Sequence, residues 1–141
     1  MKTFKSRFNS SIKVVYVERT DAEYDRIKHL FDIHGYAFLT QSVIFVNKSK
    51  LEDENLFKKS YLIFIESHEV AHHVLGHNSL KRNSKHEAEA DYIGIKLCED
   101  SDFKSALNVG KKYFAQRNSI SFEKYHIKYG LKLVSKLVNK K

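Results

Sequence analysis

The chain has 141 residues, of which 42% are hydrophobic and 30% are charged, a balance typical of a folded domain rather than a disordered segment. This length predicts a single domain over residues 1–141, and a lone cysteine, Cys98, excludes an internal disulfide and any zinc site built from several cysteines. The formal net charge of +8 is compatible with a nucleic-acid partner, but no nucleic-acid-binding motif accompanies it.

A strand followed by a helix is expected in the first 35 residues. Residues 12–18 are rich in β-branched side chains that alternate with other residues, which predicts a strand. A helix is expected over residues 21–34, because Thr20 or Asp21 can cap its start and Gly35 can end it.

The next stretch, residues 36–47, predicts a β-hairpin. Apolar runs at residues 37–39 and 43–46 flank a short polar segment, the pattern of two strands joined by a turn. Residues 48–56 are mostly polar and are expected to form a connection to the next element.

Four helices are expected in the remaining chain. They cover residues 57–77, 84–99, 102–116 and 122–139, and a turn over residues 78–83 separates the first two. Strands come first and helices follow, an order that predicts an α+β fold. No apolar run is long enough to cross a bilayer and the start of the chain does not resemble a signal peptide, so a cytoplasmic protein without membrane contact is expected.

A metal-binding pattern lies in the first of these helices. His68 and His72 are four residues apart, so a helix would present both imidazoles on one face, where they can bind one Zn²⁺ at about 2 Å. Glu69 is offset around the helix. Its carboxylate is expected to act as a general base, taking the proton of a water bound to that ion.

The third ligand of a catalytic zinc is expected in the next helix, where three carboxylates follow one another closely. Glu87 can complete the site, and Asp91, one turn further on, can accept a hydrogen bond from a ligand histidine. Glu89 is rotated by about 200° from Glu87 and is expected to face away. The spacing of Ser84 and Glu87 also fits a capping box, in which Glu87 would only cap its own helix.

Two small residues of the same helix, Ala90 and Gly94, are four positions apart. They are expected to let this helix approach the helix that carries His68 and His72 closely.

The group that would stabilise the oxyanion of a hydrolytic reaction has several candidates. His126 can donate a hydrogen bond to an oxyanion, but it lies on an apolar stripe, where a histidine can equally be a core residue with a hydrogen-bond partner. Tyr113, Tyr125 and Tyr129 are alternatives for the same role.

Two runs of the sequence resemble known motifs. HEVAHHVLGH at residues 68–77 and EAEADYIGIKL at residues 87–97 are similar to the HExxH and ExxAD motifs of gluzincin-type zinc metalloproteases. The second run is very similar to the corresponding motif of the HtpX/CaaX-prenyl-protease-like peptidases. The strand-forming run SVIFVN at residues 42–47, followed by a short connection to the helix with His68 and His72, resembles the layout of the ImmA/IrrE family. The resemblance covers residues 41–97 and implies a small zincin-like domain with Zn²⁺ held by His68, His72 and Glu87.

The expected function is a soluble zinc-dependent endopeptidase that hydrolyses peptide bonds of a cytoplasmic protein, with a repressor or regulator as a candidate substrate. The alternative is a basic regulatory protein that binds nucleic acid or protein and retains a zinc site without turnover. The net charge of +8 suggests this alternative. The sequence contains no pattern that specifies the cleavage site or the oligomeric state.

Overall fold

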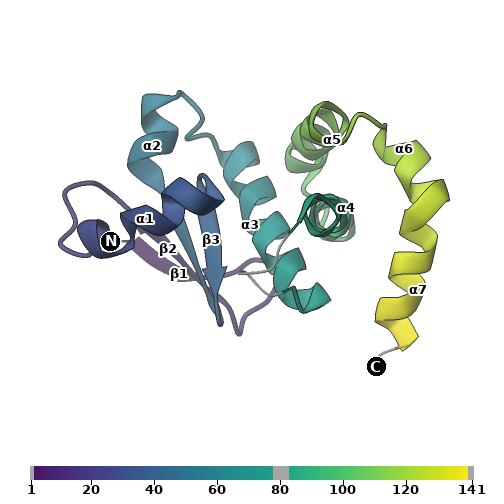
Figure 1. Ribbon diagram of the computed structural model, residues 1–141, viewed down its shortest axis with the longest axis horizontal. Helices are drawn as coiled ribbons and strands as arrows, with labels where there is room; N and C mark the ends of the chain where they lie inside the picture. The colour runs from purple at the N-terminus through teal and green to yellow at the C-terminus, as the bar shows by residue number, and fades with distance from the viewer. Residues whose placement is uncertain (1, 78–82, 140–141) are drawn as a thin grey trace.

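The computed structural model describes residues 2–77 and 83–139 and has the α+β architecture expected from the sequence, with a four-stranded sheet beside a group of helices (Figure 1). The strands lie in the order β1-β2-β4-β3, and only the central pair, β2 and β4, is parallel. Their bounds are Lys2–Lys5 for β1, Lys13–Val17 for β2, Ala37–Thr40 for β3 and Val43–Asn47 for β4. The predicted strand and hairpin are confirmed, and β1 is an addition.

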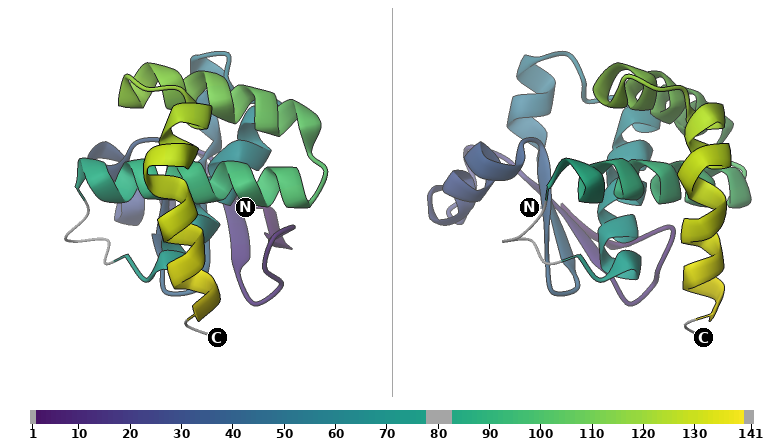
Figure 2. Two further views of the ribbon diagram at one scale, coloured as in Figure 1. Left: turned by 90° about the vertical axis from the view of Figure 1, so that its right-hand side faces the viewer. Right: turned by 45° about the vertical axis from the view of Figure 1, so that its right-hand side comes forward.

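The helices account for most of the remaining described chain. Their bounds are Tyr24–His34 for α1, Lys48–Asp53 for α2, Lys59–Leu75 for α3, Ser84–Asp100 for α4, Lys104–Asn118 for α5, Phe122–Tyr125 for α6 and Leu131–Asn139 for α7. A π-helical turn, His126–Gly130, joins α6 to α7. Figure 2 shows α4 crossing behind α7, so that α4 lies between α3 and the C-terminal helices.

The prediction of a polar connection at residues 48–56 is wrong over its first part, because α2 forms there. The Asn47 side chain caps this helix by accepting a hydrogen bond from the Lys50 backbone N–H, and Leu51 is fully buried beneath it. One buried residue in a six-residue helix leaves too little apolar periodicity to predict it.

The predicted start of α1 is also wrong. The Asp21 carboxylate accepts a hydrogen bond from the Glu18 backbone N–H instead of capping the helix, and α1 begins three residues later at Tyr24. The helix does end at Gly35, as expected, and Gly35 has a positive φ of 92°.

Helix α3 lies at the centre of the molecule. Ten successive residues, 63–72, are buried. Ile65 and Val70 pack with the sheet, whereas Phe64 and Ala71 pack with α4 and α5. Polar side chains in this helix are therefore held in fixed positions by packing on several sides. Within the described ranges no helix is long and apolar enough to cross a membrane.

Helices α3 and α4 approach closely at Gly94, as the small residues of α4 lead one to expect. A Cβ atom at Gly94 would lie 3.0 Å from the His68 backbone nitrogen and 3.1 Å from the His68 Cα, and Ala90 is fully buried in the same interface. The absence of a side chain at Gly94 thus sets the distance between the helix that carries His68 and the helix that carries Glu87.

Replacing Gly94 by Ala is expected to destabilise the fold although alanine favours a helix by about 1 kcal/mol over glycine. The added methyl group would press on the backbone of a buried helix, and such overpacking typically costs about 1–3 kcal/mol. Chemical unfolding should show a lower free energy of unfolding than the wild type, whereas Lys85→Ala, at an exposed position of α4, should not. A Gly94→Ala protein more stable than the wild type would show that α3 and α4 can separate freely.

Candidate metal centre

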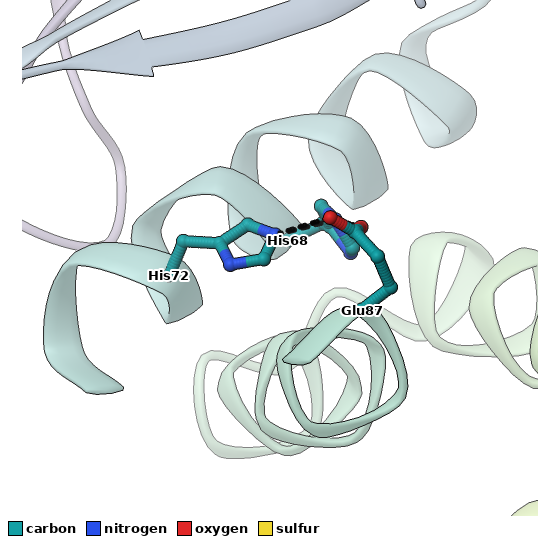
Figure 3. Close-up of side chains that lie close together, drawn as sticks. All are labelled: His68, His72 and Glu87. Carbon is teal, nitrogen blue, oxygen red and sulfur yellow. Dashed lines mark hydrogen bonds and ion pairs between the residues drawn. The ribbon is translucent and has the colours of Figure 1, made fainter. Parts of the chain in front are cut away.

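Three side chains from α3 and α4 meet at one point (Figure 3). His68 Nε2 lies 2.9 Å from Glu87 Oε2, His72 Nε2 lies 3.4 Å from Glu87 Oε1, and the two Nε2 atoms are 3.1 Å apart. Figure 3 shows the Glu87 carboxylate reaching from α4 toward both imidazoles of α3. The predicted ligands His68, His72 and Glu87 are therefore brought together.

The three side chains have the spacing and chemistry of a zinc ligand set. Two bonds of about 2.0–2.1 Å at a tetrahedral angle separate ligand atoms by roughly 3.3 Å, close to the distances of 2.9, 3.1 and 3.4 Å between these side chains. Two imidazole nitrogens and one carboxylate oxygen are also ligands that Zn²⁺ prefers, and three protein ligands leave a fourth position for a reactant. The residues present fit a Zn²⁺ ion.

The capping-box interpretation of Glu87 is wrong, because another residue caps α4. The Asn83 side chain accepts a hydrogen bond from the His86 backbone N–H at 2.9 Å, which leaves the Glu87 carboxylate directed at α3. The predicted turn over residues 78–83 lies outside the described residues except for Asn83.

Asp91 supports His68 from behind, in the position expected for it. Its Oδ1 accepts a hydrogen bond from His68 Nδ1 at 2.7 Å, and Asp91 is only 1% exposed. In the neutral imidazole, a proton on Nδ1 leaves the Nε2 lone pair free to face Glu87 and His72, as a metal ligand requires. Two side chains of α5 also donate to Asp91, Arg117 through Nη2 and Asn118 through Nδ2 at 3.3 Å.

The hydrogen bonds in this cluster change the pKa values of its members. Burial acts to lower the pKa of the His68 imidazole, but the bonds to Asp91 and Glu87 outweigh it and raise that pKa to about 10. Burial acts to raise the pKa of Glu87, but the bonds with His68 and His72 outweigh it and hold that pKa well below its usual range. The contacts with Asp91 and Glu87 therefore favour the protonated form of His68 at neutral pH.

A divalent ion that binds here is expected to release a proton from His68 at pH 7, because a ligand nitrogen must be deprotonated. The raised pKa of His68 lies above pH 7, so the apparent affinity should increase by about tenfold per pH unit near neutrality. Calorimetry in two buffers of different ionisation enthalpy measures the number of protons released. Zinc binding without proton release would contradict the protonated state of His68.

Glu69 lies beside the three ligands at the edge of an open cleft. It is 5% exposed, and its Oε2 is 3.9 Å from His68 Nε2. The cleft has a volume of about 440 Å³. Its walls come from α1, β3, α3, α4 and α5 and include Ile33, Ala37, Tyr61, Phe64, Glu87 and Arg117. A molecule in this cleft would contact the side chain of Glu69 together with those of His68 and Glu87.

The predicted oxyanion residues do not line this cleft. His126 Nδ1 is 2.5 Å from the Tyr92 hydroxyl oxygen, and the imidazole stacks on the rings of Tyr92 and Phe122. Of the described residues that line the cleft beside His68, none is His126, Tyr113, Tyr125 or Tyr129. The geometry thus gives no support to the oxyanion role of His126.

Arg117 is a site residue that the sequence does not reveal. It lines the cleft while donating to Asp91, and its guanidinium lies over the Phe64 ring, 5.8 Å from the ring centroid. Arg117 is 26 residues beyond Asp91 in a separate helix, so no local spacing connects the two.

Comparisons of the chain with protein-family models, with curated proteins and with solved structures give no match. The resemblance to gluzincin-type proteases therefore stays a prediction that rests on residues 68–77 and 87–97. The meeting of His68, His72 and Glu87 beside Glu69 is a separate observation about the same segments.

Proposed function

We propose that this protein is a zinc-dependent endopeptidase that hydrolyses peptide bonds of a cytoplasmic protein. The observation that carries the proposal is the group of His68, His72 and Glu87, arranged as zinc ligands, with the Glu69 carboxylate next to it in an open cleft. When bound, Zn²⁺ supplies a Lewis acid that polarises a carbonyl group and makes water more acidic.

Side chains of α3 and α4 have three proposed roles: metal binding, orientation of a ligand and proton transfer. His68, His72 and Glu87 would hold the ion, and Asp91 would keep the His68 ring oriented through its hydrogen bond to Nδ1. Glu69 accepts a proton from the attacking water and passes it to the leaving amine, the task of a general acid–base group. Its burial in the wall of the cleft places the carboxylate where few bulk water molecules compete for that proton.

Arg117 is proposed to stabilise the negative charge that develops on the carbonyl oxygen, in place of His126. Its side chain is 49% exposed and lines the cleft, while the bond to the buried Asp91 fixes its direction. A positioned cation near a developing oxyanion lowers the energy of the transition state.

An extended peptide fits the shape of the surroundings. Strand β3 is the end strand of the sheet, and Tyr36 and Ala37 at its start line the cleft. A peptide in extended form can bind alongside an end strand through main-chain hydrogen bonds. A protein substrate would therefore present an exposed, unfolded segment to this cleft.

Metal analysis and a peptide-library assay test the proposal together. The purified chain should contain about one zinc per molecule, cleave members of the library, lose activity with a chelator and regain it with Zn²⁺. A chain that takes up no zinc would refute the proposal. A chain that binds zinc but cleaves neither the library nor proteins captured by Glu69→Gln would favour the regulatory alternative without turnover.

A further inference from the structure

The second ligand histidine, His72, has a partner on the side away from Glu87. Its Nδ1 lies 2.9 Å from Nδ1 of His77, and the Nε2 of His77 lies 3.3 Å from Oε1 of Glu89. The His72 side chain has no exposure, and that of His77 is 7% exposed. A continuous chain of contacts thus leads from His72 through His77 to a carboxylate of α4.

The C-terminal turn of α3 builds this arrangement. Gly76 has a positive φ of 70°, which glycine adopts without strain, and the His77 backbone N–H donates to the His72 carbonyl oxygen at 3.0 Å. The turn folds His77 back over the last helical residues. His86 of α4 stacks on His77 with ring centroids 4.2 Å apart and an interplanar angle of 25°, which fixes the plane of the His77 ring.

One arrangement of protons satisfies both the contact between His72 and His77 and the contact between His77 and Glu89 when His72 binds a metal through Nε2. His72 then carries its proton on Nδ1 and donates it to His77 Nδ1, which must be an acceptor. His77 consequently carries its own proton on Nε2 and donates it to Glu89. The arrangement parallels that of His68, whose Nδ1 is held by Asp91 directly.

We propose that Glu89, acting through His77, is a positioning residue for the zinc ligand His72. This inference rests on the proposed metal centre. Asp91 orients the ligand His68, and the inference adds a residue that orients the other ligand, His72. The sequence predicts only that Glu89 faces away from Glu87, and the contact of Glu89 with His77, behind the ligand histidine, gives this carboxylate a proposed role that helix phase does not indicate.

A second metal site is the competing interpretation, because His77, His86 and Glu89 have ligand atoms within 4.8 Å of one another. Imidazole lone pairs lie in the plane of the ring, so two stacked rings direct them nearly parallel rather than toward one ion. His77 would also have to give up its contact with His72 or with Glu89 to bind a metal. These contacts favour the positioning role.

Zinc competition with a chelator, on full-length variants, tests the proposal. Glu89→Ala and His77→Ala should weaken zinc binding by roughly 10- to 100-fold, the range typical of groups that orient a ligand. Glu89→Gln should restore most of the affinity, because the amide oxygen still accepts from His77 Nε2. Glu99→Ala removes the same charge from an exposed part of α4, where Glu99 pairs with Lys96, and should leave zinc binding unchanged.

A nitrogen NMR measurement of the His72 ring separates positioning from mere stability. In the zinc-loaded wild type the Nδ1–H of His72 should exchange slowly with water, and in His77→Ala it should exchange faster. The position of the ring proton is also measured on the metal-free protein under conditions in which the His72 imidazole is neutral. A chain that binds no zinc would therefore refute the proposed function, while this measurement would still decide whether His77 accepts from His72.

Three results would overturn the proposal. The first is wild-type zinc affinity in Glu89→Ala, and the second is unchanged exchange of the His72 ring proton in His77→Ala. The third is a second zinc ion per wild-type chain that disappears in His86→Ala, which would assign His77 and Glu89 to a separate metal site.

Discussion

Replacing Glu69 by glutamine is expected to reduce peptide hydrolysis by on the order of a hundredfold or more while the protein keeps its zinc. The amide has the shape of the carboxylate but cannot accept the proton of the attacking water. Because Glu69 is outside the ligand triangle of His68, His72 and Glu87, its replacement removes no metal bond. Steady-state hydrolysis of a cleaved peptide and metal analysis of the same preparation measure the two effects.

The control for this experiment is Glu52→Gln, which makes the same chemical change at an exposed position of α2. It should retain both zinc and activity. If Glu69→Gln hydrolysed peptides as fast as the wild type, Glu69 would have no part in the proton transfer. If it lost its zinc, the carboxylate would have to be reassigned as a ligand.

Replacing Glu87 by alanine is expected to weaken zinc binding on the order of 100- to 1000-fold, more than any other carboxylate of α4. Structural zinc sites in small peptides bind with about 10–16 kcal/mol shared among four ligands, so one ligand contributes about 2.5–4 kcal/mol. Asp91→Ala should weaken binding less, by roughly 10- to 100-fold, because Asp91 acts through His68. Chelator competition on each variant gives the order.

The comparison with Asp91 is informative because both carboxylates contact the same histidine. Glu87 contacts His68 at Nε2, the nitrogen that faces His72, whereas Asp91 contacts the opposite nitrogen. Circular dichroism before each titration shows whether the variant is folded. Both variants must be folded for this comparison. If Asp91→Ala then lost more zinc affinity than Glu87→Ala, Asp91 would be the ligand and Glu87 the residue that orients His68.

Residues that are close in the sequence could be placed from the sequence, because helix geometry fixes their relative directions. The four-residue spacing of His68 and His72 and that of Glu87 and Asp91 predicted which side chains share a face. The α+β class followed equally from the order of strand and helix patterns.

Contacts between distant segments could not be placed in this way. Glu66 is a buried acid of α3, and its carboxylate accepts from Ser6 Oγ at 2.8 Å and from the Arg7 backbone N–H at 2.7 Å. Arg117 reaches Asp91 across 26 residues. No periodicity connects such partners, because their proximity results from how whole helices and strands pack. The place of Arg117 in the cleft therefore appears only in three dimensions.

The contact between Glu89 and His77 could not be predicted from helix phase either. Helix phase correctly separated Glu89 from Glu87, yet it carried no information about what would lie on the other side. That neighbour is determined by the turn at Gly76, which returns the chain over His72. Helix phase predicts the direction in which a side chain points. Which residue it contacts depends on how a second segment packs against the helix.

The burial of α3 over residues 63–72 has a consequence for the timescale on which the metal centre can open. Backbone amides in the best-protected part of a protein exchange their hydrogens with solvent only when the whole molecule unfolds. The amides of His68 and His72 belong to this part and should be among the slowest in the chain to exchange deuterium. The backbone that carries these two ligands would then be released only as often as the entire domain unfolds.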